Sequence, residues 1–218
     1  DVLASALTFN KFALNHYLQG FGIRISDSLL VRKGSDISDQ DVIEKIGLPC
    51  FIKPNEGGSS FGVTKVKTAE QIRPAIEKAM HESDEVMVEA FMAGTEITCG
   101  CYKTRTKEVV FPITEVVSKN EFFDYAAKYD GESQEITPAR LDDDTTRRVK
   151  TLTSAIYDIL GCEGIIRVDY IITEGGKINL LEVNTTPGMT ATSFIPQQVR
   201  AAGLDIKDVM TDIIENKF

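Results

Sequence analysis

The amino-acid sequence predicts an α+β protein built from two lobes. Strand-like and helix-like segments alternate along its 218 residues. Two pairs of strand-like segments are joined by glycine-rich turns, at residues 57–62 and 175–176. Such turns are typical of antiparallel hairpins and argue against a purely parallel sheet. The length suffices for two lobes with their own cores, and we place the boundary after Ala93.

The first lobe, residues 1–93, is marked by helical spacing of apolar residues, by capping residues and by glycines that end helices. Its expected elements are a helix over 3–21, an extended segment over 23–31, a helix from 38–39 to 46, two strands around the first glycine-rich turn, a helix over 68–82 and a strand over 85–92. Pro74 falls in the second turn of the 68–82 helix, where a kink is expected.

The second lobe, residues 94–218, is expected to carry the other hairpin. Its elements are strands over 96–102 and 108–117, a helix over 142–160, the hairpin over 164–184, and helices over 194–202 and 205–217. The segment 118–140 has no clear period and contains four aromatic residues close together. A long aromatic segment of this kind is more typical of a lid than of a linker.

Composition excludes several classes of function. The net charge is −9, which argues against a nucleic-acid or anionic-membrane partner. No apolar run is long enough to span a bilayer. The four cysteines lack metal-binding spacing and the two histidines lie in helical patterns, so zinc has little support. Reduced thiols and the lack of a signal-peptide pattern favour a cytoplasmic location.

The stretch from Gly164 to Gly188 carries the strongest chemical signal. If Gly175 and Gly176 are the two turn residues of the hairpin, Asp169 lies opposite Glu182 and Arg167 lies opposite Asn184. Alternation along each strand puts all four polar side chains on one face. The opposite face carries apolar residues that are expected in the core: Ile166, Val168, Tyr170, Ile172, Leu181 and Val183.

Two opposed carboxylates repel one another unless a cation neutralises them. Their oxygens and that of Asn184 are ligands that Mg²⁺ prefers, and Arg167 adds a fixed cation that suits a phosphoryl group. The alternative is a solvated outer face on which Arg167 merely balances the two acids. Because the strand runs directly into Thr-Thr-Pro-Gly beside the polar cluster, we favour a metal–phosphate site.

A second signal is the glycine-rich loop after Lys53. Gly57, Gly58, Ser59 and Ser60 offer backbone N–H and hydroxyl groups to a phosphate. This is not a Walker A loop, because the lysine precedes the glycines and a strand follows. The alternative is a flexible hairpin tip, although a lysine at the end of an apolar strand favours a phosphate site.

In this order, these motifs resemble the ATP-grasp fold and, within it, the D-alanine–D-alanine ligase family. The resemblance covers essentially the whole chain. It depends on Ser5-Ala-Leu-Thr with Lys11, Phe51-Ile-Lys-Pro with Gly58-Ser-Ser-Phe-Gly62, Asp124-Tyr-Ala-Ala-Lys-Tyr129, Gly164-Ile-Ile-Arg-Val-Asp169 and Leu181-Glu-Val-Asn-Thr-Thr-Pro-Gly-Met189. Some family members have an acidic residue where Gly57 stands, which leaves the loop conformation open.

The resemblance implies a role for each matching residue. The ATP-binding residues would be Lys11, Lys53, Gly58, Ser59, Ser60, Gly62, Glu89, Ala90, Phe91, Met92, Glu96 and Lys128. Asp169, Glu182 and Asn184 would hold two Mg²⁺ ions, with Mn²⁺ as an alternative. Arg167 and the Gly188 N–H would stabilise the oxyanion, Ser193 would anchor the second substrate's carboxylate, and Ser59 with Tyr129 would complete the closed site. By themselves, Glu89 and Glu96 could equally be unpaired surface carboxylates.

The implied function is ATP-dependent joining of two D-alanines through an acyl phosphate, for peptidoglycan precursor synthesis. The residues themselves show neither the substrate's configuration nor the oligomeric state; family members are commonly homodimers. The alternatives are another ATP-grasp carboxylate–amine ligase, a D-alanine–D-lactate ligase, or a nucleotide-binding fragment without turnover. Family members carry a further domain before this point, so we expect these 218 residues alone to bind ATP but to be poorly active.

Overall fold

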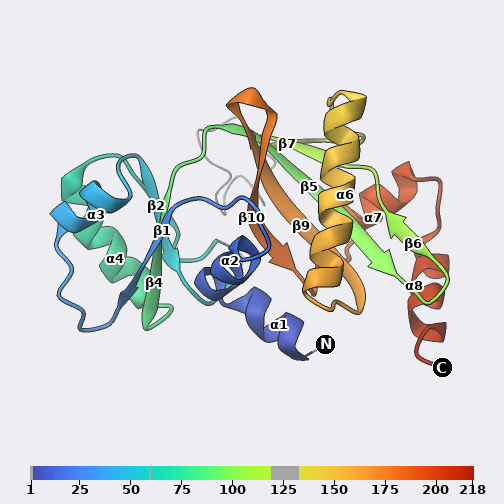
Figure 1. Cartoon of the computed structure of the whole chain (residues 1–218), viewed down its shortest axis with the longest axis horizontal. Coiled ribbons are helices and arrows are strands. Elements are labelled where there is room, and N and C mark those ends of the chain that lie inside the picture. Colours follow the sequence, from blue (N-terminus) through green and yellow to red (C-terminus); the bar gives the residue numbers. More distant parts are fainter. Residues whose placement is uncertain (1, 59, 119–132) are drawn as a thin grey trace. The chain divides into compact units, whose positions relative to one another are not determined.

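The computed structural model describes residues 2–58, 60–118 and 133–218 (Figure 1). These residues form two compact units. The N-terminal unit contains Phe9–Ala93, and the C-terminal unit contains residues 2–8, 94–117 and 134–218. The expectation that residues 1–93 form one lobe therefore needs a correction, because residues 2–8 group with the C-terminal unit. Within that unit, the Thr8 hydroxyl lies 3.2 Å from the hydroxyl of Thr185.

The helix expected over residues 3–21 is two helices, α1 (Val2–Phe9) and α2 (Lys11–Gln19). Asn10 separates them in an extended conformation, and its side chain accepts a hydrogen bond from the N–H of Ala13. An asparagine that caps the next helix cannot also continue the previous one. The uninterrupted helix predicted here is therefore wrong.

The N-terminal unit contains a four-stranded antiparallel sheet in the order β1–β4–β2–β3. Its strands are β1 (Ser28–Arg32), β2 (Cys50–Pro54), β3 (Thr64–Val66) and β4 (Glu85–Ala90). Helices α3 (Asp39–Lys45) and α4 (Ile72–Met80) supply apolar residues to one core with this sheet. β1 is shorter than the extended segment predicted over 23–31.

A short 3-10 turn, η1 (Ala69–Gln71), precedes α4, so Pro74 lies in the first turn of the α-helix. A proline there lacks an N–H that the helix would not have used. The kink expected at Pro74 is therefore not required.

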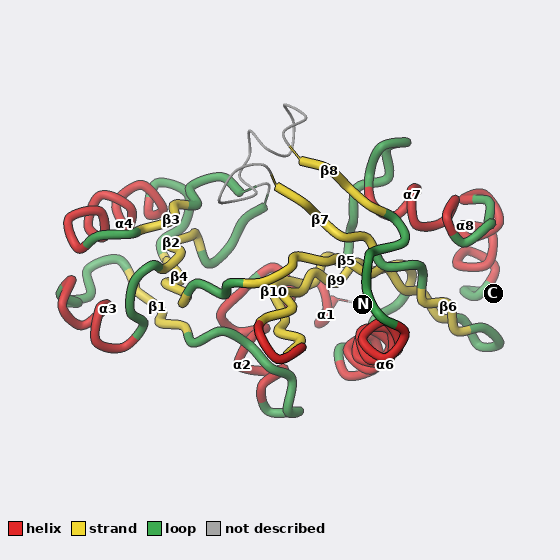
Figure 2. Tube along the Cα trace, turned by 90° about the horizontal axis from the view of Figure 1, so that it is seen from above, coloured by secondary structure: helices red, strands yellow, loops and turns green. Residues whose placement is uncertain are grey.

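The C-terminal unit contains a six-stranded sheet in the order β10–β9–β5–β7–β8, with β6 paired to β5 (Figure 2). Its strands are β5 (Gly94–Lys103), β6 (Glu108–Val110), β7 (Thr114–Ser118), β8 (Ser133–Ile136), β9 (Gly164–Thr173) and β10 (Lys177–Asn184). Helix α6 (Asp143–Ile159) lies on one side of the sheet, and α7 (Phe194–Ala201) and α8 (Ile206–Glu215) lie on the other.

The two sides have different cores. On the α6 side, the Thr153 hydroxyl lies 2.8 Å from the hydroxyl of the fully buried Tyr170, beside the buried Cys99 and Val168. On the α7 and α8 side, Tyr102 and Phe111 pack with Ile195, Val199 and Val209. This second core covers only one end of β5, which leaves polar residues further along the same face.

The β9–β10 hairpin is closed by a three-residue turn, η2 (Glu174–Gly176), instead of the predicted two-residue turn. Pairing near the turn is consequently shifted by one residue, with Leu180 opposite Tyr170. A bulge at Leu181 restores the predicted register, so Glu182 lies opposite Asp169 and Asn184 opposite Arg167. Leu181 was predicted in the core, but Leu180 is fully buried in its place.

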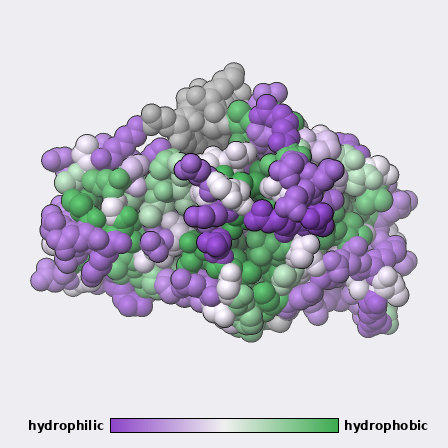
Figure 3. Space-filling model, turned by 45° about the horizontal axis from the view of Figure 1, so that its top comes forward, coloured by the Kyte–Doolittle hydropathy of each residue, from purple (hydrophilic) through white to green (hydrophobic). Residues whose placement is uncertain are grey.

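Hydrophilic residues cover much of the face shown in Figure 3, with apolar residues between them. Among the described residues, no helix is long and apolar enough to cross a membrane. All four cysteines are free thiols and buried, as expected for small core residues.

Candidate functional site

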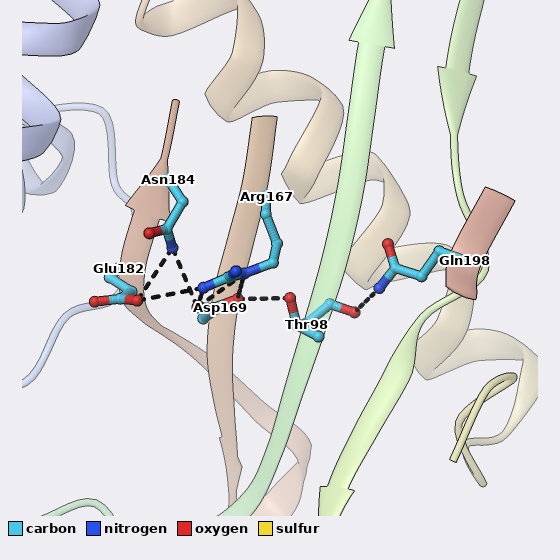
Figure 4. Close-up of polar contacts among 6 residues, drawn as sticks. All are labelled: Thr98, Arg167, Asp169, Glu182, Asn184 and Gln198. Atoms are coloured by element: carbon cyan, nitrogen blue, oxygen red, sulfur yellow. Dashed lines mark hydrogen bonds and ion pairs between the residues drawn. The ribbon is translucent and has the colours of Figure 1, made fainter. Parts of the chain in front are cut away.

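The polar face of the β9–β10 hairpin brings four predicted site residues together (Figure 4). Arg167 and Asp169 come from β9, and Glu182 and Asn184 from β10. The bulge places both β10 residues on the same face as their partners, because it shifts the alternation by one position. The hairpin's other face packs into the core, so the four side chains are held on a rigid support.

Arg167 is the central cation of this cluster. Its Nε lies 2.9 Å from Asp169 Oδ1 and its Nη2 lies 2.8 Å from Asp169 Oδ2, which makes a two-pronged ion pair. The same Nη2 is 3.5 Å from Glu182 Oε1. The Phe194 ring lies beside the guanidinium, 5.3 Å from its carbon.

Asn184 joins the two carboxylates. Its amide nitrogen lies 3.3 Å from Asp169 Oδ2 and 3.1 Å from Glu182 Oε1. The amide oxygen takes no part in these bonds. The cluster thus has two carboxylates, one guanidinium and one amide, so these four side chains carry a formal charge of −1.

Burial and charge act on the two central groups in different ways. Burial, and then the nearby Glu182, raise the pKa of Asp169 above its usual value, although Arg167 acts in the opposite direction. Burial disfavours the charged form of Arg167, but Asp169 and Glu182 raise its pKa, so it stays a cation. An added cation at the carboxylates would remove the repulsion that burial makes costly.

Two residues that the sequence did not single out support Asp169. The Thr98 hydroxyl donates a hydrogen bond to Asp169 Oδ1 at 2.5 Å. Gln198 of α7, fully buried, donates to the backbone oxygen of Thr98 at 3.0 Å. Thr98 shares its face of β5 with Glu96, and that alternation was the only signal in the sequence. For Gln198 there was none, because its place depends on how α7 packs.

The N-terminal unit carries a second ionic pair. Lys53 Nζ lies 2.6 Å from Glu89 Oε2, and the two side chains are 11% and 2% exposed. The other carboxylate oxygen of Glu89 is buried and has no hydrogen-bond partner in the described structure. An orphaned buried oxygen is costly, so it marks a place where a ligand donor would be favourable. The surface-carboxylate reading of Glu89 is therefore wrong.

The start of α2 holds the glycine-rich loop. Lys11 Nζ donates to the backbone oxygen of Gly57 at 2.8 Å, and the N–H of Phe12 donates to the side chain of Asn55 at 2.9 Å. Ser60 and Gly62 both have positive φ, 58° and 70°. The loop thus has a defined bend, with Lys11 beside it.

The remaining predicted residues lie in separate places. Phe91, whose ring is 3.9 Å from Lys65 Nζ, follows β4 together with Met92, while Ala90 ends that strand. Glu96 lies on β5, on the same face as Thr98. Near Gly188, the Ser193 hydroxyl lies 2.8 Å from that of Thr190. Gly58 is exposed. Ser59, Lys128, Tyr129 and most of the expected lid lie outside the described residues.

The residues on the hairpin fit a magnesium site by their chemistry. Among the described residues, no three His, Cys, Asp or Glu side chains form a metal-binding group. The hairpin cluster instead offers two carboxylates and one amide, an all-oxygen set that suits Mg²⁺ with phosphate oxygens and water as further ligands. The formal charge of −1 on these four side chains favours a bound cation.

Comparison with known proteins agrees with this fold. A family model described as D-ala D-ala ligase C-terminus matches residues 17–215. A D-alanine–D-alanine ligase of Phocaeicola vulgatus is 80% identical over all 218 residues, which span 67% of that protein. The crystal structure of VanG D-Ala:D-Ser ligase from Enterococcus faecalis has a TM-score of 0.89 at 32% identity, over 100% of this chain and 64% of that one.

A D-alanine–D-alanine ligase from Bacillus anthracis, determined in complex with ATP, matches with a TM-score of 0.81 at 26% identity, over 99% of this chain and 66% of that one. The two antiparallel sheets and these structural matches thus define a protein of the ATP-grasp class. More narrowly, the chain belongs to the D-alanine–D-alanine ligase family. It spans about two thirds of the length of the relatives it matches.

Proposed function

We propose that this chain carries the nucleotide- and metal-binding part of an ATP-dependent ligase that joins D-alanine to D-alanine. The observation that carries the proposal is the hairpin cluster, in which Arg167 holds the buried Asp169 beside Glu182 and Asn184. Ion pairing alone does not require two acids around one base at a buried position. The 80% identity to a D-alanine–D-alanine ligase supports the choice of substrate.

The second ionic pair supports ATP as the nucleotide. Lys53 and Glu89 neutralise one another, so the unpartnered oxygen of Glu89 favours a neutral hydrogen-bond donor, which an adenine amino group would supply. The backbone from Ala90 to Met92 would line the base, and Glu96 would accept from the ribose hydroxyls. Lys11, Lys53 and the loop through Gly58, Ser60 and Gly62 would contact the phosphates.

Asp169, Glu182 and Asn184 would hold the metal, for which we propose two Mg²⁺ ions. When bound, Mg²⁺ would offset phosphate charge and orient the transferred phosphoryl group. Arg167, fixed by its bonds to Asp169, would present a guanidinium whose charge survives burial. That charge would favour the oxyanion that forms when an amine attacks an acyl phosphate.

The reaction would have two steps. In the first, the carboxylate of one D-alanine takes the γ-phosphoryl group of ATP and ADP leaves. In the second, the amine of the other D-alanine displaces phosphate from the acyl phosphate and the new amide forms. We propose the N–H of Gly188 as a second oxyanion donor and Ser193 as the anchor of the second carboxylate. Ser59, Lys128 and Tyr129 complete the proposed closed site, and a homodimer is part of the proposal on family grounds alone.

The hairpin cluster can be tested with Glu182→Gln, which keeps size and removes one metal ligand charge. We expect Mg²⁺ to lose most of its effect on the affinity for a non-hydrolysable ATP analogue, and the low D-alanine-dependent phosphate release of these 218 residues to fall at least about a hundredfold. Without metal, stability should stay within about 1 kcal/mol of wild type or rise, because a repulsion disappears. Glu174→Gln, at the exposed turn of the same hairpin, is the matched control. Wild-type turnover by the Glu182 variant would remove this cluster from the mechanism.

A further inference from the structure

The sheet of the C-terminal unit has a gap along one edge of β5. On that edge, β7 pairs with Glu96–Thr98 and β6 pairs with Cys101–Lys103. Neither of these two strands pairs with β5 at Gly100. The Gly100 oxygen accepts a hydrogen bond from the N–H of Phe111 at 2.9 Å. Its N–H lies on the same edge and is buried, so it needs an acceptor from elsewhere.

Gln198 fills this gap with its side-chain amide. Its Oε1 accepts from the Gly100 N–H at 2.9 Å, and its Nε2 donates to the Thr98 oxygen at 3.0 Å and to the Thr114 hydroxyl at 3.1 Å. These partners fix which end of the amide is which. The side chain therefore takes the place of a peptide group of the missing strand, between the two pairings of β5.

A glycine at position 100 lets α7 come this close. A Cβ atom there would lie 2.4 Å from Ile195 Cδ1 and 2.8 Å from Gln198 Oε1. Both contacts are too short for real atoms, so a larger residue would displace the Ile195 and Gln198 side chains from their positions against β5. The sequence thus provides both the amide and the space it needs.

The gap lies next to the hairpin cluster. Thr98, whose backbone oxygen Gln198 holds, is opposite Asp169 in the β5–β9 register. The Thr98 hydroxyl makes the shortest bond to Asp169, at 2.5 Å to Oδ1. The same oxygen accepts from Arg167 Nε at 2.9 Å. A shift of Thr98 would leave only Arg167 and the longer bond from Asn184, at 3.3 Å to Oδ2, to orient the carboxylate among the described residues.

We propose that Gln198 is a positioning residue for the metal-binding carboxylate of Asp169, and that it acts through Thr98. This inference depends on the proposed function, because it assumes that Asp169 holds a cation. Partners behind a metal ligand orient it, and their loss commonly weakens metal binding 10–100-fold. No group of Gln198 touches the cluster, so its effect should appear in metal binding and not in nucleotide binding without metal.

The test compares Gln198→Met with the wild-type chain in Mn²⁺ titrations followed by electron paramagnetic resonance, with a non-hydrolysable ATP analogue present. Methionine keeps the volume and removes both ends of the amide. We expect Mn²⁺ to bind about tenfold or more weakly, while affinity for the analogue in EDTA stays within twofold. Gln197→Met is the matched control, since the Gln197 amide donates to the Thr192 oxygen and to Glu135 of β8, and not to β5; it should bind Mn²⁺ as wild type does.

A second variant tests the route through Thr98. Thr98→Val removes the hydroxyl bond to Asp169, so adding Gln198→Met to it should change Mn²⁺ affinity by less than twofold. If Gln198→Met does not fold, Gln198→Leu measured in sucrose replaces it. A lower melting temperature with unchanged Mn²⁺ affinity would make Gln198 purely structural and overturn the inference. Absence of Mn²⁺ and nucleotide binding in the wild-type chain would instead overturn the proposed function, so the two failures are distinguishable.

Discussion

Each unit contains a buried group of charged side chains, and the two groups differ in net charge and in hydrogen bonding. In the N-terminal unit, Lys53 and Glu89 neutralise each other, yet one oxygen of Glu89 has no hydrogen-bond partner in the described structure. In the C-terminal unit, the oxygens of Asp169 receive bonds from Arg167, Thr98 and Asn184, yet Glu182 adds a second negative charge. The Lys53–Glu89 pair leaves one oxygen without a hydrogen bond, and the four side chains of the hairpin cluster carry a formal charge of −1.

This difference indicates what each place can bind. A neutral pair with an orphaned acceptor favours a ligand group that donates a hydrogen bond without bringing charge. A saturated but negatively charged cluster favours a cation and gains little from another neutral donor. We therefore expect the Lys53–Glu89 pair to take up a neutral hydrogen-bond donor and the hairpin cluster to take up a cation.

Removing Arg167, the cation of the hairpin cluster, should have the largest effect on the free energy of unfolding. Arg167→Met leaves Asp169 and Glu182 facing each other, with Asp169 buried, so we expect a loss of about 3–5 kcal/mol in the free energy of unfolding. Urea unfolding in EDTA measures this loss, and added Mn²⁺ should recover part of it. The control is Arg147→Met, at an exposed pair with Asp144, which should cost less than about 0.5 kcal/mol. Equal losses for the two variants would show that the cluster is not strained by its charge.

Removing the cation of the Lys53–Glu89 pair should lower the free energy of unfolding by less. Lys53→Met leaves one buried carboxylate without its ionic partner, so we expect a loss of about 2–3 kcal/mol in the free energy of unfolding. Mn²⁺ should not restore this stability. Lys33→Met, at an exposed pair with Asp84, is the control. Recovery of the Lys53 variant by Mn²⁺ would contradict the distinction between the two places.

The sequence predicted the functional pairs of the hairpin better than the hairpin itself. Asp169 opposite Glu182 and Arg167 opposite Asn184 are confirmed, although the turn has three residues and the pairs near it are shifted. Adjacent glycines suit turns of either length, and a bulge at Leu181 cancels the difference. No pattern in the sequence predicts that bulge. The extra turn residue and the bulge each shift the pairing by one residue, in opposite directions, so the predicted pairs at the site are correct.

Other parts of the site depend on contacts that alternation and spacing do not encode. Asn10 was predicted inside a helix, and only its bond to Ala13 shows that it begins α2 and places Lys11 at the first position. Gln198 lies in an ordinary helical pattern, and its role depends on where α7 meets Gly100. Local patterns thus specify elements and facing residues, whereas the supporting bonds come from packing between distant segments.

The smallest and most selective effect is expected for Glu89→Gln. The amide keeps the size of the side chain, and Lys53, still 11% exposed, retains a neutral acceptor and some solvent, so we expect a stability change of about 1 kcal/mol. Binding of an ATP analogue in EDTA, measured by calorimetry, should weaken about tenfold, which corresponds to about 1.4 kcal/mol. The further gain in affinity on adding Mn²⁺ should stay as in wild type.

Glu182→Gln should show the opposite pattern, with unchanged analogue binding in EDTA and a smaller gain from Mn²⁺. Together, the two variants distinguish the Lys53–Glu89 pair from the hairpin cluster. Glu89→Gln should weaken nucleotide binding without metal, and Glu182→Gln should reduce the additional affinity that Mn²⁺ provides. If both variants lost the same part of the affinity, the Lys53–Glu89 pair and the hairpin cluster would not differ as their charges indicate. The affinity for the nucleotide must be measured both in EDTA and with Mn²⁺, because turnover would fall in either variant and would not distinguish them.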